Sequence, residues 1–168
     1  GEAAEAIKRM RERAPDLAYR LEVDAQAGTF SAEMVIEAAR TTRALLGHFK
    51  ERRSGVIINI ASIVAHGRGD MQLKPAYNAS KAGIIEFSHW CAVRLAEYNV
   101  RVNTISPGLV HTGLWEGLGA QLKEEFPEEF PADMPTRAIF DQWVEARVPL
   151  KREQTPRDIG MAAVFLAS

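Results

Sequence analysis

Residues 56–62 read Val-Ile-Ile-Asn-Ile-Ala-Ser, a short, nearly continuous apolar run rich in β-branched side chains. Such runs are typical of a strand in a parallel sheet that is covered on both faces. The sequence therefore predicts a strand at 56–61. Ser62 follows at its carboxyl end, where open α/β sheets bind their ligands. The alternative for Ser62 is a turn residue that ends the strand.

The segments around this strand predict alternating helices and strands. Upstream, residues 32–53 carry apolar side chains at helical spacing after Ser31, a candidate N-cap, and predict a long amphipathic helix. Downstream, a helix is expected at about 76–98 and a second strand at 100–105. The residues that follow this strand, 106–112, should therefore emerge at the same edge of the sheet as Ser62.

Tyr77 and Lys81 stand four residues apart at the start of the 76–98 helix, within Ala-Tyr-Asn-Ala-Ser-Lys. This spacing places the phenol and the ammonium on one face of the helix, one turn apart. A fixed cation stabilises a phenolate and should lower the pKa of Tyr77 from its ordinary value near 10, as acid–base chemistry requires. Taken alone, the spacing is more typical of a surface pair.

The rest of the chain predicts peripheral elements. Residues 2–13 are rich in helix formers, and 18–24 alternate as a short strand does. Residues 113–147 contain acidic pairs and several prolines, and predict a helical insertion that is either a lid over the site or a solvated excursion. Thr155-Pro156 should cap a final helix at 157–166.

Composition excludes several classes of protein. Of the 168 residues, 46% are hydrophobic and 26% charged, and the net charge of −1 gives no reason to expect nucleic acid or an anionic membrane as partner. No apolar stretch approaches the ~20 residues that span a bilayer. The single cysteine, Cys91, lies in an apolar helical run and should be a buried thiol, which fits a cytoplasmic protein.

Histidine and tryptophan residues offer weaker candidates. The four histidines do not form a metal-like cluster by spacing, so no metal site is expected. His111 alone lies near the expected site and is either a surface residue or a contact to ligand. Trp115 and Trp143, in the lid-like segment, should pack rather than contact an apolar substrate.

Read together, these motifs resemble the short-chain dehydrogenase/reductase family, in particular its hydroxysteroid and 3-oxoacyl-ACP reductases. The resemblance is carried by a strand ending in Ser62, by Tyr77-x-x-x-Lys81, and by the Arg-Val-Asn-Thr-Ile-Ser-Pro-Gly stretch of 101–108. It implies an α/β Rossmann-like fold with a doubly wound parallel sheet. Thr-Pro-Arg-Asp-Ile-Gly at 155–160 agrees with it.

The resemblance also implies a reaction, the interconversion of a secondary alcohol and a ketone with NAD or NADP. Tyr77 would be the general acid/base, Lys81 would tune it and bind the nicotinamide ribose, and Ser62 would hold the substrate oxygen. The cofactor would further be held by the loop after the second strand, through Pro107, Gly108, Val110 and Thr112. The family implies a homodimer or homotetramer that acts on a small carbonyl or alcohol substrate.

The sequence departs from the family pattern at both ends. Up to residue 55 glycine occurs only at 1, 28, 47 and 55, so no glycine-rich phosphate-binding turn can be formed. Met34 stands where distance from Gly55 would place the family's helix Asn. The family's last strand and closing glycine-rich turn do not follow Ser168. The fold is therefore expected to be incomplete at the N-terminus and the C-terminus.

These departures leave two interpretations open. The favoured one is a partial sequence of a longer enzyme, with a single domain at 1–168 divided into a remnant of the dinucleotide-binding half (1–30), a catalytic core (31–112), a substrate lid (113–147) and a C-terminal helix (148–168). The other is a short variant that acts as a non-catalytic binding or scaffold protein and dimerises through its long helices.

Overall fold

The computed structural model describes residues 33–66 and 75–168. The predicted helix at 2–13, the predicted strand at 18–24 and the proposed N-cap Ser31 lie outside the described residues. Within the described ranges the elements occur in the predicted order. No helix in these ranges is both long and apolar enough to cross a bilayer.

The two described strands are neighbours in one parallel sheet. Strand β1 (Gly55–Ile60) pairs with β2 (Val100–Ile105) along its whole length, from Gly55 opposite Val100 to Ile60 opposite Ile105. The predicted bounds of β2 are confirmed, whereas β1 begins and ends one residue earlier than predicted. The parallel pairing places the carboxyl ends of both strands at one edge, as expected.

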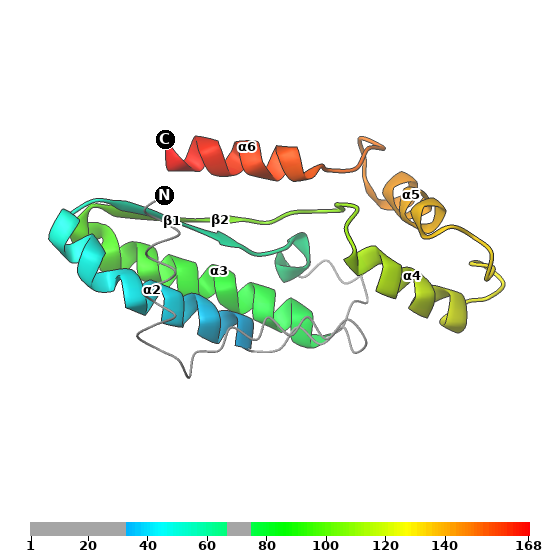
Figure 1. The fold of residues 1–168 in the computed structure, drawn as a ribbon, viewed down its shortest axis with the longest axis horizontal. Coiled ribbons are helices and arrows are strands. Elements are labelled where there is room, and N and C mark those ends of the chain that lie inside the picture. Colours follow the sequence, from blue (N-terminus) through cyan, green and yellow to red (C-terminus); the bar gives the residue numbers. More distant parts are fainter. Residues whose placement is uncertain (1–32, 67–74) are drawn as a thin grey trace.

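Helices cover both faces of this strand pair (Figure 1). Helices α2 (Glu33–Arg52) and α3 (Pro75–Leu95) lie side by side on one face, and α6 (Pro156–Ala167) lies on the other. The predicted 76–98 helix ends as a short 3-10 turn, η2 (Ala96–Tyr98). Where α2 and α3 cross, a Cβ on Gly83 would lie 2.9 Å from Val35 Cγ2, so a small residue is needed there.

The core beneath the sheet joins α2, α3 and β2. Its buried members are Phe49, Cys91, Leu95 and Val100. The Cys91 side chain is 1% exposed, and burial raises the pKa of its thiol. The prediction of a buried thiol is confirmed, and a raised pKa makes Cys91 a poor nucleophile.

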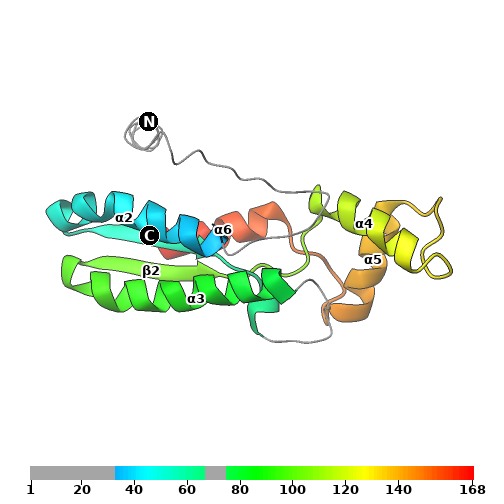
Figure 2. The ribbon, with the colours of Figure 1, turned by 90° about the horizontal axis from the view of Figure 1, so that it is seen from below.

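The segment at 113–147 folds as two packed helices, α4 (Leu114–Glu125) and α5 (Thr136–Arg147), which project beyond the end of the sheet (Figure 2). Two apolar cores lie among these helices and the loops beside them, and their buried members are Leu109, Trp115, Leu122, Phe130, Ile139, Phe140 and Val144. The ring of Trp115 meets those of Phe140 and Trp143 edge-on at 4.7 and 5.5 Å. Packing is therefore the role of both tryptophans here, as predicted.

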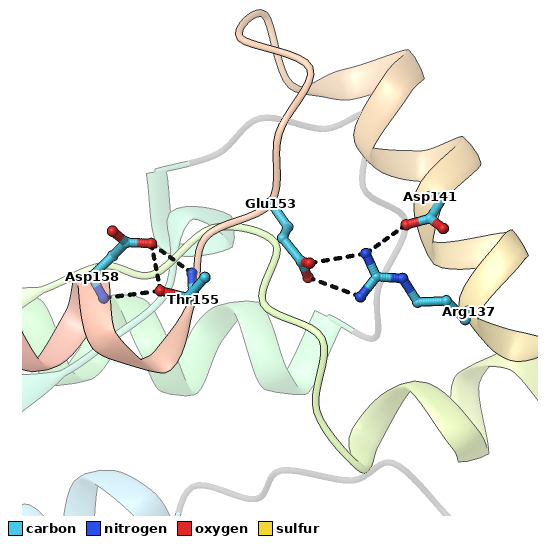
Figure 3. Close-up of polar contacts among 5 residues, drawn as sticks. All are labelled: Arg137, Asp141, Glu153, Thr155 and Asp158. Atoms are coloured by element: carbon cyan, nitrogen blue, oxygen red, sulfur yellow. Dashed lines mark hydrogen bonds and ion pairs between the residues drawn. The ribbon is translucent and has the colours of Figure 1, made fainter.

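Helix α6 begins with the predicted cap. The Thr155 hydroxyl accepts a hydrogen bond from the Asp158 N–H at 3.2 Å, and the Asp158 carboxylate accepts one from the Thr155 N–H at 2.7 Å. This reciprocal capping box gives side-chain acceptors to two backbone donors at the helix start (Figure 3). The carboxylate is stabilised by these bonds, and the pKa of Asp158 is lowered.

Candidate active site

Ser62 lies where the loops after β1 and β2 come together. The Ala61 N–H donates to the Ile105 carbonyl at 2.8 Å, and the Ile63 N–H donates to the Pro107 carbonyl at 3.0 Å. The chain then turns into a short 3-10 helix, η1 (Ile63–His66). Ser62 is held between these contacts and is 8% exposed, which places its hydroxyl in a dry, fixed position.

Tyr77 stands in the first turn of α3, and its side chain is hydrogen-bonded to Ser62. Burial raises the pKa of Tyr77, and the hydrogen bond with Ser62 lowers it by less. Residues 15 positions apart in the sequence are thereby brought together as the resemblance requires. The phenol remains protonated at neutral pH.

Lys81 lies one turn further along α3 and is 6% exposed. Its ammonium donates to the Ile60 carbonyl at 3.0 Å and lies 5.8 Å from the centre of the Tyr77 ring. Burial lowers the pKa of Lys81, because a buried ammonium loses its hydration. The three side chains predicted to form the site are thus gathered at one end of the strand pair.

One expectation is corrected by this geometry. The sequence predicted that Lys81 lowers the pKa of Tyr77, whereas the pKa is raised. The physical reason is that loss of hydration around the half-buried phenol outweighs the hydrogen bond from Ser62. Spacing along a helix gives the face on which two residues lie, but not the hydration that sets their ionisation.

The loop after β2 passes beside this site. The Gly108 N–H donates to Gln154 Oε1 at 2.5 Å, and the Gln154 N–H donates to the Leu109 carbonyl at 2.9 Å. Val110 forms an isolated parallel β-bridge with Gln154. Thr112 is exposed, and its carbonyl accepts the Trp115 N–H at the start of α4. The roles predicted for Pro107, Gly108, Val110 and Thr112 toward a cofactor remain predictions.

The two histidines near the candidate site make contacts within the protein. His111 is half-buried with its ring edge-on to Phe140 at 5.0 Å, and its Nε2 is buried without a hydrogen-bond partner. His66 Nε2 lies 3.3 Å from Ser106 Oγ, which joins η1 to the end of β2. Among residues 33–66 and 75–168 no group of His, Cys, Asp and Glu side chains is arranged to hold a metal ion.

Sequence reasoning missed two contacts at this site. The Ile60 carbonyl is the acceptor for Lys81, and Gln154 holds the loop after β2. Neither has a sequence signal, because a backbone carbonyl is present at every residue and Gln154 lies 46 positions from Gly108. A link between Arg137 and Glu153, drawn in Figure 3, was equally unforeseen.

Comparisons with known proteins agree with this architecture. A family model described as enoyl-(acyl carrier protein) reductase matches residues 24–168. The chain is 40% identical over 116 residues to the 3-oxoacyl-(acyl-carrier-protein) reductase of Chlamydia muridarum, covering 69% of this chain and 39% of that protein. It is 36% identical over 127 residues to L-fucose dehydrogenase of Bos taurus, covering 76% and 42%.

Solved structures give the same picture. The L-sorbose reductase of Gluconobacter frateurii, in complex with NADPH and L-sorbose, superimposes with a TM-score of 0.69 at 30% identity, over 80% of this chain and 48% of that one. A xylitol dehydrogenase with NAD⁺ bound gives a TM-score of 0.64 at 26% identity, over 79% and 50%.

The fold and the matches define a Rossmann-like α/β domain. More particularly, the chain belongs to the short-chain dehydrogenase/reductase family. It spans less than half the length of the curated relatives named above.

Proposed function

We propose that this chain provides the carbonyl-binding and proton-transfer part of an NAD(P)-dependent oxidoreductase that interconverts a secondary alcohol and a ketone. The observation that carries the proposal is the hydrogen bond between the half-buried Tyr77 phenol and the buried Ser62 hydroxyl, with the Lys81 ammonium one turn away. Two hydroxyls that converge in this way can bind one oxygen atom between them.

In the reducing direction, Ser62 and Tyr77 both donate hydrogen bonds to the substrate carbonyl oxygen and polarise it. The hydride for the new C–H bond would come from a nicotinamide cofactor when one is bound. The carbonyl oxygen takes the Tyr77 proton as the C=O double bond becomes single, and Tyr77 is left as phenolate. Because the pKa of Tyr77 is raised, the phenol carries its proton before the reaction and is available as the acid.

Lys81 has its role after this proton transfer. An ammonium close to the ring stabilises the phenolate that forms, although it does not lower the pKa of Tyr77 in the free protein below its ordinary value. The effect is electrostatic and is strongest in a dry site, and Lys81 is 6% exposed. Lys81 is therefore proposed to act on the product side of the proton transfer.

The residues at the sheet edge fit a nicotinamide cofactor. Gly108 has no side chain between its backbone and the site loops, and a Cβ there would lie 3.2 Å from Gln154 Oε1 and 3.7 Å from Ile63 Cδ1. Lys81 would bind the ribose, the backbone at 107–110 would border the nicotinamide, and Thr112 would reach its amide or phosphates. Structural relatives with NADPH or NAD⁺ bound support the choice of a nicotinamide cofactor.

The proposed protein is a homodimer or homotetramer acting on a small carbonyl or alcohol substrate, and no nucleic acid or membrane partner is part of the proposal. An interface between copies is supported by α3, where Trp90 and Val93 are 57% and 78% exposed. Large apolar side chains exposed together on a helix are a common sign of association.

The function is tested with the full protein, NADH and NADPH in turn, and a panel of ketosugars and 3-oxoacyl thioesters. The expected result is oxidation of one reduced cofactor that depends on the ketone, together with quenching of tryptophan fluorescence as that cofactor binds. Ser62→Ala should lower kcat about 100-fold or more, as removal of an oxyanion donor does. Binding of neither cofactor to the full protein would refute the proposal.

A further inference from the structure

Gln154, from a distant part of the chain, is bonded to the loop after β2. Gln154 contacts three consecutive residues of this loop. Its Oε1 accepts the Gly108 N–H at 2.5 Å, its N–H donates to the Leu109 carbonyl at 2.9 Å, and it forms a β-bridge with Val110. One side-chain bond and one backbone bridge thus link Gln154 to the chain at 108–110.

Packing does not fix this loop on the side that faces Gln154. A cavity of 360 Å³ is lined by Gly108 and Leu109 on one wall, and by the loop at 147–150 and Gln154 on another. Gly108 brings no side chain to fill it. At Gly108 the course of the loop therefore depends on hydrogen bonds, whereas the neighbouring Leu109 is buried in the core formed with Trp115 and Phe140.

Gln154 is itself held on both sides. Its predecessor Glu153 accepts two hydrogen bonds from the Arg137 guanidinium on α5, at 2.9 and 3.4 Å, and Arg137 also pairs with Asp141 at 2.9 Å (Figure 3). Its successor Thr155 is fixed in the capping box of α6. The residue that orders the loop is thus anchored between two helices, even though its own side chain is exposed.

We propose that Gln154 is a positioning residue for the nicotinamide cofactor. It holds the backbone at 108–110 in the conformation that binds the nicotinamide, so that binding does not have to order the loop. Preorganisation of this kind raises affinity by removing an ordering cost. The inference rests on the proposed function, since it assigns to the 108–110 loop the ligand named there.

The test compares Gln154→Ala and Gln154→Glu in the full protein. In Gln154→Ala the KM and the Kd of the cofactor should rise about threefold to tenfold, the loss expected for one hydrogen bond. The kcat at saturating cofactor and the KM of the ketone should stay within about twofold. Gln154→Glu should recover most of the cofactor affinity, because a carboxylate oxygen can accept the same Gly108 N–H.

A matched control is Gln121→Ala. Gln121 is an exposed glutamine on α4 whose side chain bonds only to Glu125, at 2.6 Å, among the contacts of the described residues. It should leave the cofactor KM unchanged, which is the quantity that the Gln154 variants are compared on. Amide hydrogen exchange at 108–110 gives a readout that needs no cofactor, and Gln154→Ala should accelerate exchange there while α3 keeps its protection.

The two proposals fail in different ways. A wild-type protein that binds neither cofactor refutes the proposed function. An unchanged cofactor KM in Gln154→Ala, or unchanged exchange at 108–110, refutes the role of Gln154 even in an active enzyme. A fall in thermal midpoint and kcat with no change in cofactor KM would show that Gln154 only stabilises the fold, and also overturns the inference.

Discussion

Replacement of Tyr77 by phenylalanine should separate the chemistry of this site from its stability. The substitution removes only the phenolic oxygen, so the ring keeps its place in the first turn of α3 and its distance from Lys81. The oxygen is the atom that bonds to Ser62 and the one that would transfer the proton. The unfolding free energy therefore reports the loss of the hydrogen bond with Ser62, and kcat reports the loss of the proton donor.

The expected magnitudes differ by several kilocalories per mole. Loss of the hydrogen bond with Ser62 should lower the unfolding free energy by about 1 kcal/mol. Part of this loss is offset, because the half-buried Tyr77 hydroxyl, which needs a partner, is removed as well. Loss of a general acid lowers kcat about 10²- to 10⁴-fold, or about 3–5 kcal/mol of transition-state stabilisation. Urea unfolding measures the first quantity, and steady-state reduction of the best ketone measures the second.

Tyr98→Phe is the matched control. Tyr98 lies at the end of η2, where the Lys50 ammonium is 5.1 Å from its ring centre, so it too is a tyrosine beside a lysine but far from Ser62 along the chain. Its kcat should stay within about twofold of wild type. A Tyr77→Phe protein that is folded and keeps more than about a tenth of wild-type kcat would refute the assignment of Tyr77 as the acid.

Other substitutions test the packing, the cap and the ionisation described above. Phe140→Ala removes a fully buried ring from against Trp115 and should lower the unfolding free energy by about 3–5 kcal/mol in urea; a loss below about 1 kcal/mol would contradict a packed core between α4 and α5. Thr155→Ala should cost about 1 kcal/mol by breaking the bond with Asp158, whereas Thr155→Ser, which keeps the hydroxyl, should cost less than half of that. As pH rises above 10.0, Tyr77 ionises in the unfolded chain while burial keeps it protonated in the folded protein, so the unfolding free energy should fall in this range. If the unfolding free energy of Tyr77→Phe falls as steeply with pH, Tyr77 is not the source of the dependence.

Much of the fold could be predicted because its signals are local. The β-branched run at 100–105 gave the bounds of β2 correctly, and Thr155 with Asp158 identified the start of α6. The one-residue error in β1 has a structural cause. Gly55 is paired because Val100 lies opposite it in the register, and register belongs to the pair of strands rather than to either sequence.

The proximity of the candidate site residues was predictable from the sequence, but their electrostatics were not. Ser62, Tyr77 and Lys81 come together as their motif implied. The direction of the Tyr77 pKa was wrong, because hydration depends on how deeply the ring is buried by residues distant in sequence. The contact between Gln154 and Gly108 could not be predicted at all, since an exposed glutamine has many possible partners and no periodicity selects one.

The hydrogen bond from Lys81 to the Ile60 carbonyl affects how a substitution of this lysine is interpreted. The Lys81 ammonium bonds to the Ile60 carbonyl, two residues before Ser62. This bond links the end of β1, which is followed by the Ser62 hydroxyl, to α3, which carries the Tyr77 hydroxyl. Removing the amine thus misaligns the two oxygens as well as withdrawing a charge. A Lys81→Ala protein supplied with a small primary amine would regain the cation but not the link between α3 and β1. The difference between its rate and the wild-type rate would measure how much the alignment of the Ser62 and Tyr77 hydroxyls contributes.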